Sequence, residues 1–90
     1  MNNQEFLNKL KVINDPTRLT IIQLLAKNKV MCACKILEEL SITQGTLSHH
    51  MKLLARTGLI GCSRVGKWCH YTLLTENFKD IIEFLDKIYG

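Results

Sequence analysis

The sequence predicts a mainly α-helical fold with one β-hairpin, a winged helix-turn-helix that spans residues 1–90 as a single domain. Three observations predict this class. Residues 41–57 show the pattern of an amphipathic helix without any acidic residue, and a shorter helical pattern precedes them by only two or three residues. Residues 59–73 then form two short runs of β-favouring residues. A short helix, a tight turn, a second helix and a hairpin follow one another as in a winged helix-turn-helix.

The composition bounds the class of protein. Ninety residues with 47% hydrophobic content suit one globular domain with a modest core. No apolar run reaches about 18 residues, so we expect no transmembrane span. The first residues, Met1-Asn-Asn-Gln-Glu-Phe6, lack the basic start and apolar core of a signal peptide. We therefore expect a cytoplasmic protein with no membrane partner, and we expect its four cysteines to be reduced thiols.

Two helices are expected in the first third of the chain. The apolar residues between positions 3 and 13 recur at helical spacing and predict a first amphipathic helix. Asp15 and Pro16 predict the start of the next, with Asp15 as N-cap and Pro16 at the first helical position. This helix runs to about Lys27. It is apolar nearly all round, which predicts a central buried helix.

The helix-turn-helix follows. Residues 28–31 are expected to turn the chain before a short helix from about position 32 to Leu40. In the next helix Leu47, Met51 and Leu54 recur at i, i+4 and i+7, so one face is buried. Either Ser41 or Thr43 can cap its start, and Gly58 suits a left-handed C-terminal cap. The other face carries polar and basic side chains, as base edges and phosphates in a DNA major groove require: Gln44, Thr46, Ser48, His49, Lys52 and Arg56.

A β-hairpin and a last helix complete the predicted fold. The two β-rich runs are split by Val65-Gly66, which we take as a two-residue turn with Arg64 and Lys67 beside the tip of the wing. Thr75 is expected to cap a last amphipathic helix over residues 76–89. The first and last helices carry more apolar surface than so small a domain can cover. This surplus predicts a symmetric homodimer joined through them, which suits a palindromic operator.

The positive charge of the chain is concentrated in one segment. The net charge is +4, and residues 41–75 contain Lys52, Arg56, Arg64 and Lys67 but no acidic residue. The remainder of the chain holds eight basic and eight acidic residues and is neutral. The placement favours a polyanionic partner at this segment, although a simple solvated basic face would show the same composition.

Several of these segments together resemble the ArsR/SmtB family of dimeric winged-helix repressors that sense metals or thiol-reactive compounds. The resemblance implies a repressor that leaves double-stranded operator DNA when an inducer binds, and that needs no cofactor to bind DNA. It covers residues 5 to 75 approximately. The matching motifs are Asp15-Pro-Thr-Arg-Leu19, Cys32-Ala-Cys34, Gln44-Gly-Thr-Leu-Ser-His-His-Met-Lys-Leu-Leu54 and Gly66-Lys-Trp-Cys-His-Tyr71.

Carried over position by position, the resemblance implies specific contacts to DNA. It places Gln44, Thr46, Ser48 and His49 towards the bases with Lys52 nearby, and it matches Arg64 and Lys67 to a basic wing. His50 lies on the apolar side of its helix, three residues from Leu47 and four from Leu54. We expect His50 to be packed and hydrogen-bonded within the domain.

Cys32 and Cys34 are the candidate metal ligands. Residues two apart inside a helix point about 200° apart, but the cap residue at a helix N-terminus is not yet helical, so the two thiols can meet there. The unpaired N–H groups and the helix dipole also favour thiolates. An arsenite-type site of the family resembles this Cys-x-Cys but often has a third cysteine where this chain has Leu37. Arsenite, antimonite or a soft metal ion as inducer, a dithiol redox or persulfide switch, and two small buried side chains all remain open.

Two other sites are weaker candidates. A Val65-Gly66 turn pairs Cys62 with Cys69 across the wing, which suggests either an auxiliary redox or metal site or ordinary packing. The family's zinc site on the dimer helices resembles a set of Asp and His residues. The last helix has Asp80, Glu83 and Asp86 but no histidine, so we expect no zinc sensing there.

Two other classes of function compete with a repressor. A thiol enzyme would use Cys32 and Cys34, but the sequence shows no Cys-x-x-Cys in a βαβ setting, no phosphate loop and no acid–base constellation. A winged-helix protein-interaction module would favour a neutral or acidic second helix, and this one is basic. We therefore expect a DNA-binding repressor and not an enzyme.

Overall fold

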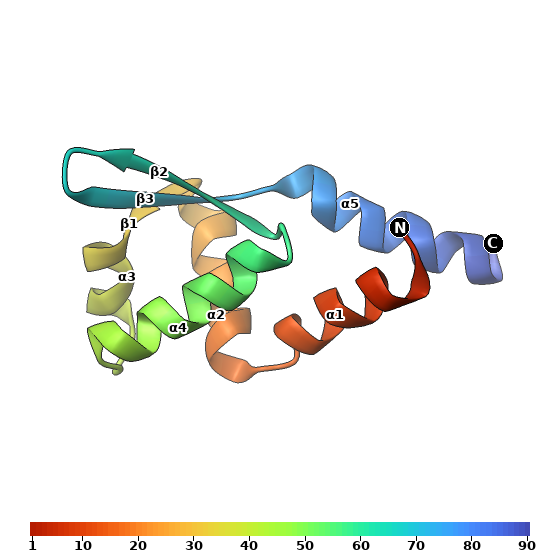
Figure 1. The fold of residues 1–90 in the computed structure, drawn as a ribbon, viewed down its shortest axis with the longest axis horizontal. Coiled ribbons are helices and arrows are strands. Elements are labelled where there is room, and N and C mark those ends of the chain that lie inside the picture. Colours follow the sequence, from red (N-terminus) through yellow and green to blue (C-terminus); the bar gives the residue numbers. More distant parts are fainter.

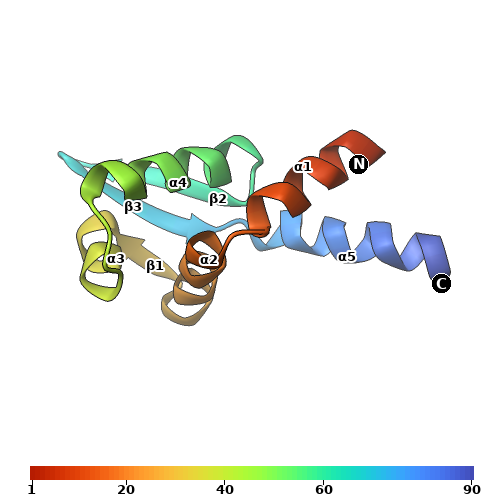
Figure 2. The ribbon, with the colours of Figure 1, turned by 90° about the horizontal axis from the view of Figure 1, so that it is seen from below.

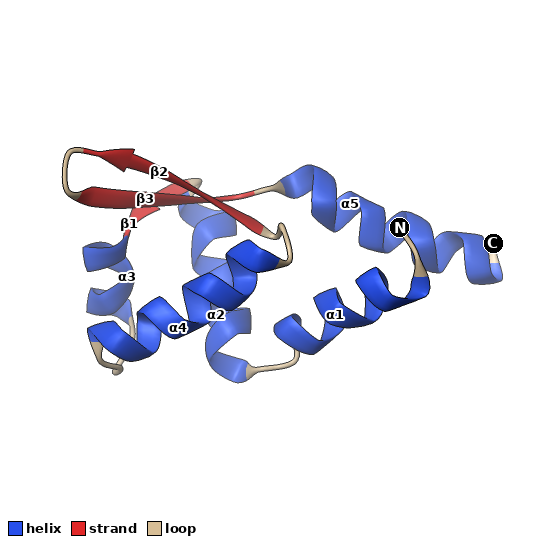
Figure 3. Cartoon of the chain, in the orientation of Figure 1, coloured by secondary structure: helices blue, strands red, loops and turns tan.

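The computed structural model describes residues 1–90 and has the predicted winged helix-turn-helix architecture (Figure 1). Helices and a small sheet pack around one core, and the sheet lies on one side of α2, α3 and α4 (Figure 3). The elements in chain order are α1 (Asn3–Ile13), α2 (Pro16–Asn28), β1 (Val30–Cys32), α3 (Ala33–Glu39), α4 (Gln44–Arg56), β2 (Ile60–Val65), β3 (Trp68–Leu73) and α5 (Thr75–Tyr89).

Local signals set most of the helix ends. The Asp15 carboxylate accepts a hydrogen bond from the Arg18 N–H at 3.0 Å, and Pro16 takes the first turn of α2. Of the two predicted caps for α4, Thr43 is the one used. Gly58 has a φ of 77°, as expected after a helix C-terminus. The predicted cap at Thr75 is wrong, because Thr75 is already helical and Leu74 precedes it without a side-chain cap.

The sheet has one strand more than predicted. Its order is β1-β3-β2, and β1 pairs Val30 with Thr72 and Cys32 with His70. The expectation that residues 28–31 only turn the chain is therefore wrong. Three residues are too few to show a β period in the sequence, and β1 exists because β3 offers it a hydrogen-bonding edge.

The predicted register of the wing is also wrong. The turn is Gly66-Lys67, so Val65 pairs with Trp68 and Cys62 lies opposite Tyr71. Gly66, with a φ of 65°, occupies the first central position of the turn and Lys67 has a negative φ. A positive φ at that position alone is the pattern of a type II′ turn, which favours glycine there. Val65 can then extend the strand instead of entering the turn.

The core is wholly apolar and joins all parts of the fold. The α4 residues Leu47, Met51 and Leu54 are at most 2% exposed, as their spacing predicts. Ile21 and Leu25 of α2 are at most 1% exposed, whereas Leu19 on the same helix is 44% exposed. The central position of α2 is thus confirmed, since it contacts α1, α4 and two strands, but its burial all round is not.

Helices α1 and α5 extend together from one end of the molecule (Figure 2). The molecule measures 43 × 23 × 21 Å, and the Phe6 and Phe84 rings stack between the two helices with centroids 4.2 Å apart. Many apolar side chains on these helices stay exposed: Leu7, Leu10, Ile82, Leu85, Ile88 and Tyr89. No helix combines the length and the apolar character that crossing a membrane requires.

Candidate DNA interface and dithiol site

The start of α4 is held by its threonine cap. The Thr43 hydroxyl oxygen accepts from the Thr46 N–H at 3.1 Å, and the two hydroxyls are 2.9 Å apart. The buried side of the helix packs into the core, so the opposite side faces outward. All five predicted DNA-contacting residues of α4 are exposed: Gln44, Thr46, Ser48, His49 and Lys52. The helix therefore presents hydroxyl, amide, imidazole and ammonium groups to solvent, without a carboxylate among them.

His50 fastens α4 to the helices before it. It is half-buried, and its Nδ1 lies 3.1 Å from Nη1 of Arg18. The Arg18 Nε donates to the Val12 carbonyl at 2.6 Å. Burial holds the pKa of His50 below its usual value, and because the guanidinium only donates, Nδ1 of a neutral imidazole is assigned as the acceptor. This Arg18–His50 contact joins α1, α2 and α4, the structural role expected for His50.

The wing carries both predicted basic residues on its exposed surface. Arg64 stands opposite Cys69, and Lys67 occupies the turn. The Lys67 ammonium lies 5.8 Å from the ring centroid of Trp68, within reach of a cation–π contact. Neither cation takes part in the two ion pairs of the molecule, Lys35–Glu38 and Lys79–Glu76, so both charges remain available to a partner.

A groove separates the wing from the helix-turn-helix, and we call it the wing groove. Its volume is about 510 Å³. Its apolar wall includes Leu37, Leu47, Trp68 and Tyr71, with the Cys34 thiol at one side. Four of the predicted DNA-contacting residues also line it: Gln44, Ser48, Arg64 and Lys67. Trp68 and Tyr71 were not predicted as site residues, although their place beside Lys67 and Cys69 in the wing was a usable signal.

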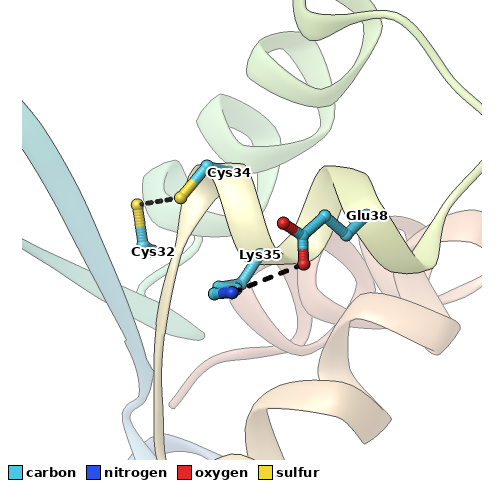
Figure 4. A network of polar contacts seen from close by, with 4 residues as sticks. All are labelled: Cys32, Cys34, Lys35 and Glu38. Atoms are coloured by element: carbon cyan, nitrogen blue, oxygen red, sulfur yellow. Dashed lines mark hydrogen bonds and ion pairs between the residues drawn. The ribbon is translucent and has the colours of Figure 1, made fainter.

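The two predicted thiol ligands meet at the start of α3. Cys32 is the N-cap residue with extended backbone and no side-chain cap bond, and Cys34 lies in the first turn. Their Sγ atoms are 2.8 Å apart, and Figure 4 shows them pointing toward each other. The hydrogen bond from the Cys34 thiol is the main cause that lowers the pKa of Cys32, and the same bond raises the pKa of Cys34. Cys34 is exposed and Cys32 is half-exposed, so a thiophilic ligand can reach both.

No third ligand completes this site within one chain. No group of three or more His, Cys, Asp or Glu side chains is placed to hold a metal ion. Leu37, at the position where a third cysteine would stand, is half-buried against the wing groove. The arrangement can therefore offer two thiolates to one soft atom, and the atom's remaining valence must be filled from elsewhere.

The other two cysteines are joined. Cys62 and Cys69 form a disulfide with an S–S distance of 1.99 Å and a Cα–Cα distance of 6.2 Å. The expectation that all four cysteines are free is therefore wrong for this pair. The two residues are diagonal neighbours on one face of the hairpin and not the directly opposed pair that the predicted turn gave. The sulfur atoms still meet because both residues point to that same face.

Comparison with known proteins gives consistent matches. Residues 15–61 match the family model described as bacterial regulatory protein, arsR family. An uncharacterized HTH-type transcriptional regulator of Methanocaldococcus jannaschii is 41% identical over 87% of this chain and 88% of its own length. An arsenical resistance operon repressor of Staphylococcus xylosus is 40% identical over 98% of this chain and 84% of its own length. The crystal structure of an ArsR family transcriptional regulator superposes with a TM-score of 0.87 at 15% identity, covering 97% of this chain and 89% of that one.

Proposed function

Because the chain belongs to the arsR family of bacterial regulatory proteins and is thus a transcriptional regulator and not an enzyme, we propose that it acts as a homodimeric repressor released from its operator by a thiophilic inducer. The inducer, an arsenite-like metalloid or a soft metal ion, would bind Cys32 and Cys34. Relatives named as arsenical resistance operon repressors, 38% to 40% identical over nearly the whole chain, support this choice of inducer.

One observation carries the DNA-binding part of the proposal. The exposed face of α4 and the tip of the wing lie in a segment of the chain that contains no carboxylate, between residues 41 and 75. Phosphates would be held by Lys52, Arg64 and Lys67, because ammonium and guanidinium groups neutralise the backbone charge. Bases would be read by Gln44, Thr46, Ser48 and His49, whose amide, hydroxyl and imidazole groups can hydrogen-bond to base edges in the major groove.

The exposed apolar residues of α1 and α5 support the homodimer. Ile82 is 66% and Ile88 is 69% exposed in the isolated chain, although α5 packs against the core through Ile81 and Phe84. Exposed apolar surface of this kind marks an interface between proteins. A twofold dimer through these helices would give the two copies of α4 the symmetry of a palindromic operator.

The position of the dithiol supports its role as inducer site. Cys32 ends β1, which pairs with the wing strand β3, and Cys34 opens α3 of the helix-turn-helix. An atom bound to both sulfurs would therefore tie the wing sheet to the helix that positions α4. A change in the position of the wing sheet relative to α3 would alter how the wing and α4 fit DNA. The free and the inducer-bound protein would then differ in affinity for the operator, as release requires.

The experiment is an operator-release assay on the purified reduced protein, with a labelled duplex from upstream of its own gene. Arsenite should release the wild-type protein, and Cys32→Ser and Cys34→Ser variants should bind the duplex normally but not respond. Cys62→Ser is the matched control and should respond like the wild type. Failure of the wild-type protein to bind the duplex in low salt would refute the repressor, and normal release of both variants would refute the site.

A dithiol redox or persulfide switch is the second candidate. The 2.8 Å separation of the Cys32 and Cys34 sulfurs and the lowered pKa of Cys32 favour it, because the thiolate is the reactive form. Release by an oxidant or a persulfide, with no response to arsenite under a phosphine reductant, would select this alternative.

A further inference from the structure

A second cavity, which we call the α1–α4 pocket, lies where α1, α2 and α4 meet. Its volume is about 620 Å³, within the range of about 300–1,000 Å³ that is usual for small-molecule sites. Four cationic side chains line it, and Glu5 is the one carboxylate among its lining residues: the cations are Lys9, Lys11, Arg18 and Arg56. The pocket shares no residue with the wing groove.

One side of α1 and the last turn of α4 form the walls of the pocket. Most of its α1 residues recur at intervals of three and four and therefore share one side of the helix: Glu5, Asn8, Lys9 and Val12. Leu53 of α4 completes a small apolar wall with Val12. Leu7 and Leu10, the exposed apolar residues of α1, point to the opposite side of the helix at 100° per residue. A dimer through α1 and α5 therefore leaves the pocket open.

The positive charges of the pocket have no anionic partner within the chain. The two ion pairs of the molecule lie on α3 and α5, and neither includes a residue of the pocket. Lys9 and Arg18 are half-buried, so their charges are less well solvated than those of fully exposed side chains. An anion that enters the pocket would compensate both charges.

Arg18 is held in position before any ligand binds. Its Nε donates to the Val12 carbonyl at 2.6 Å, and its Nη1 lies 3.1 Å from Nδ1 of His50. Its Nη2 has no partner within the chain and remains free to donate. A guanidinium group matches the paired oxygens of a phosphate or a carboxylate, and a side chain that is already ordered loses little entropy on binding.

From these observations we infer that the α1–α4 pocket binds a small organic anion with two or more phosphate or carboxylate groups. The half-buried Lys9 and Arg18 hold one anionic group, and the exposed Lys11 and Arg56 hold another. The apolar wall contacts the organic part of the ligand. A concave site with half-buried cations suits a small ligand better than a DNA backbone, whose phosphates meet exposed side chains first. This site is separate from the proposed inducer site and does not depend on it.

The test uses pyrophosphate and citrate as probes, because these anions carry the two kinds of group. Each is titrated by calorimetry into the full-length protein without DNA, at constant ionic strength set with sodium chloride. At least one of them should saturate at one molecule per chain, and the tighter one identifies phosphate or carboxylate as the preferred group.

Substitutions of the cations test the location of this binding. Lys9→Gln and Arg56→Gln should each raise the half-saturating concentration about tenfold, as expected for the loss of a hydrogen bond between charged groups. Lys27→Gln is the matched control, because Lys27 is an exposed cation in the last turn of α2 and outside the pocket. It should leave the half-saturating concentration unchanged.

Glu5→Gln should change the affinity in the opposite direction. The substitution removes the negative charge of the pocket, while the amide oxygen can still accept from the Asn2 N–H as the carboxylate does. The half-saturating concentration should fall about threefold because a like charge near the anion is lost. Damage to the fold would not tighten binding, so this gain distinguishes a direct charge effect from a structural one.

Several outcomes would overturn the inference. They are the absence of saturation by either anion at millimolar concentration, an equal loss of affinity in Lys27→Gln, and weaker binding in Glu5→Gln. A random duplex provides the last comparison, since Lys9→Gln should bind it with the same salt dependence as the wild-type protein. A smaller salt dependence in Lys9→Gln would assign the pocket to DNA phosphates instead. Because the calorimetry needs neither operator nor inducer, its result does not depend on the proposed function.

Discussion

Replacing both Arg64 and Lys67 with alanine should flatten the salt dependence of DNA binding. Both side chains are exposed at the wing and neither forms an ion pair in the free protein, so each can neutralise one phosphate. Two such cations in each chain make four in a dimer. At a slope of about −0.9 in log K against log salt for each phosphate, the double variant should lose roughly 3.6 from the slope.

The consequence is large enough to measure by fluorescence anisotropy. When the salt concentration rises from about 50 to 200 mM, the wild-type protein should lose about 150-fold more binding affinity than the variant, given the difference of roughly 3.6 in slope. Both operator and random duplexes should be weakened, because phosphate contacts carry no sequence information. Lys79→Ala removes one positive charge per chain from α5, outside α4 and the wing, and should leave the slope unchanged. An unchanged slope in the wing variant, or a loss confined to the operator, would refute the assignment of these residues to phosphates.

Three further predictions concern the fold and the dimer. Burial lowers the pKa of His50, so the unfolded chain binds a proton before the folded protein does as the pH falls below 6.5. The free energy of unfolding should therefore rise with pH up to that value. His50→Gln should flatten this rise in urea titrations. Leu54 is fully buried, and Leu54→Ala should cost about 2–5 kcal/mol in the same titrations, with a loss below about 1 kcal/mol counting against its core position. Ile82→Glu should produce a folded monomer in sedimentation experiments and weaken operator binding, because Ile82 is 66% exposed in the isolated chain; an unchanged dimer would place the interface elsewhere.

Predictions from the sequence succeeded where the determining interactions are local. The start of α2 at Asp15-Pro16 and the end of α4 before Gly58 depend on hydrogen bonds and backbone angles within a few residues. The buried face of α4 follows from the spacing of Leu47, Met51 and Leu54, since side chains three and four apart share one side of a helix. Thr75 shows the limit of such rules, because a residue type that favours caps stands one position inside the helix.

The sequence by itself therefore determined the winged helix-turn-helix class, the exposed polar and basic face of α4, and the meeting of Cys32 and Cys34, which are only two residues apart. Tertiary structure decided the rest. β1 forms only because β3, some forty residues later, pairs with it, and the register of the wing follows from which residue of the turn has positive φ. The wing groove brings Cys34 and Leu37 beside Trp68 and Tyr71. Contacts between such distant segments depend on how the whole core packs, and no periodicity or spacing within one segment encodes them.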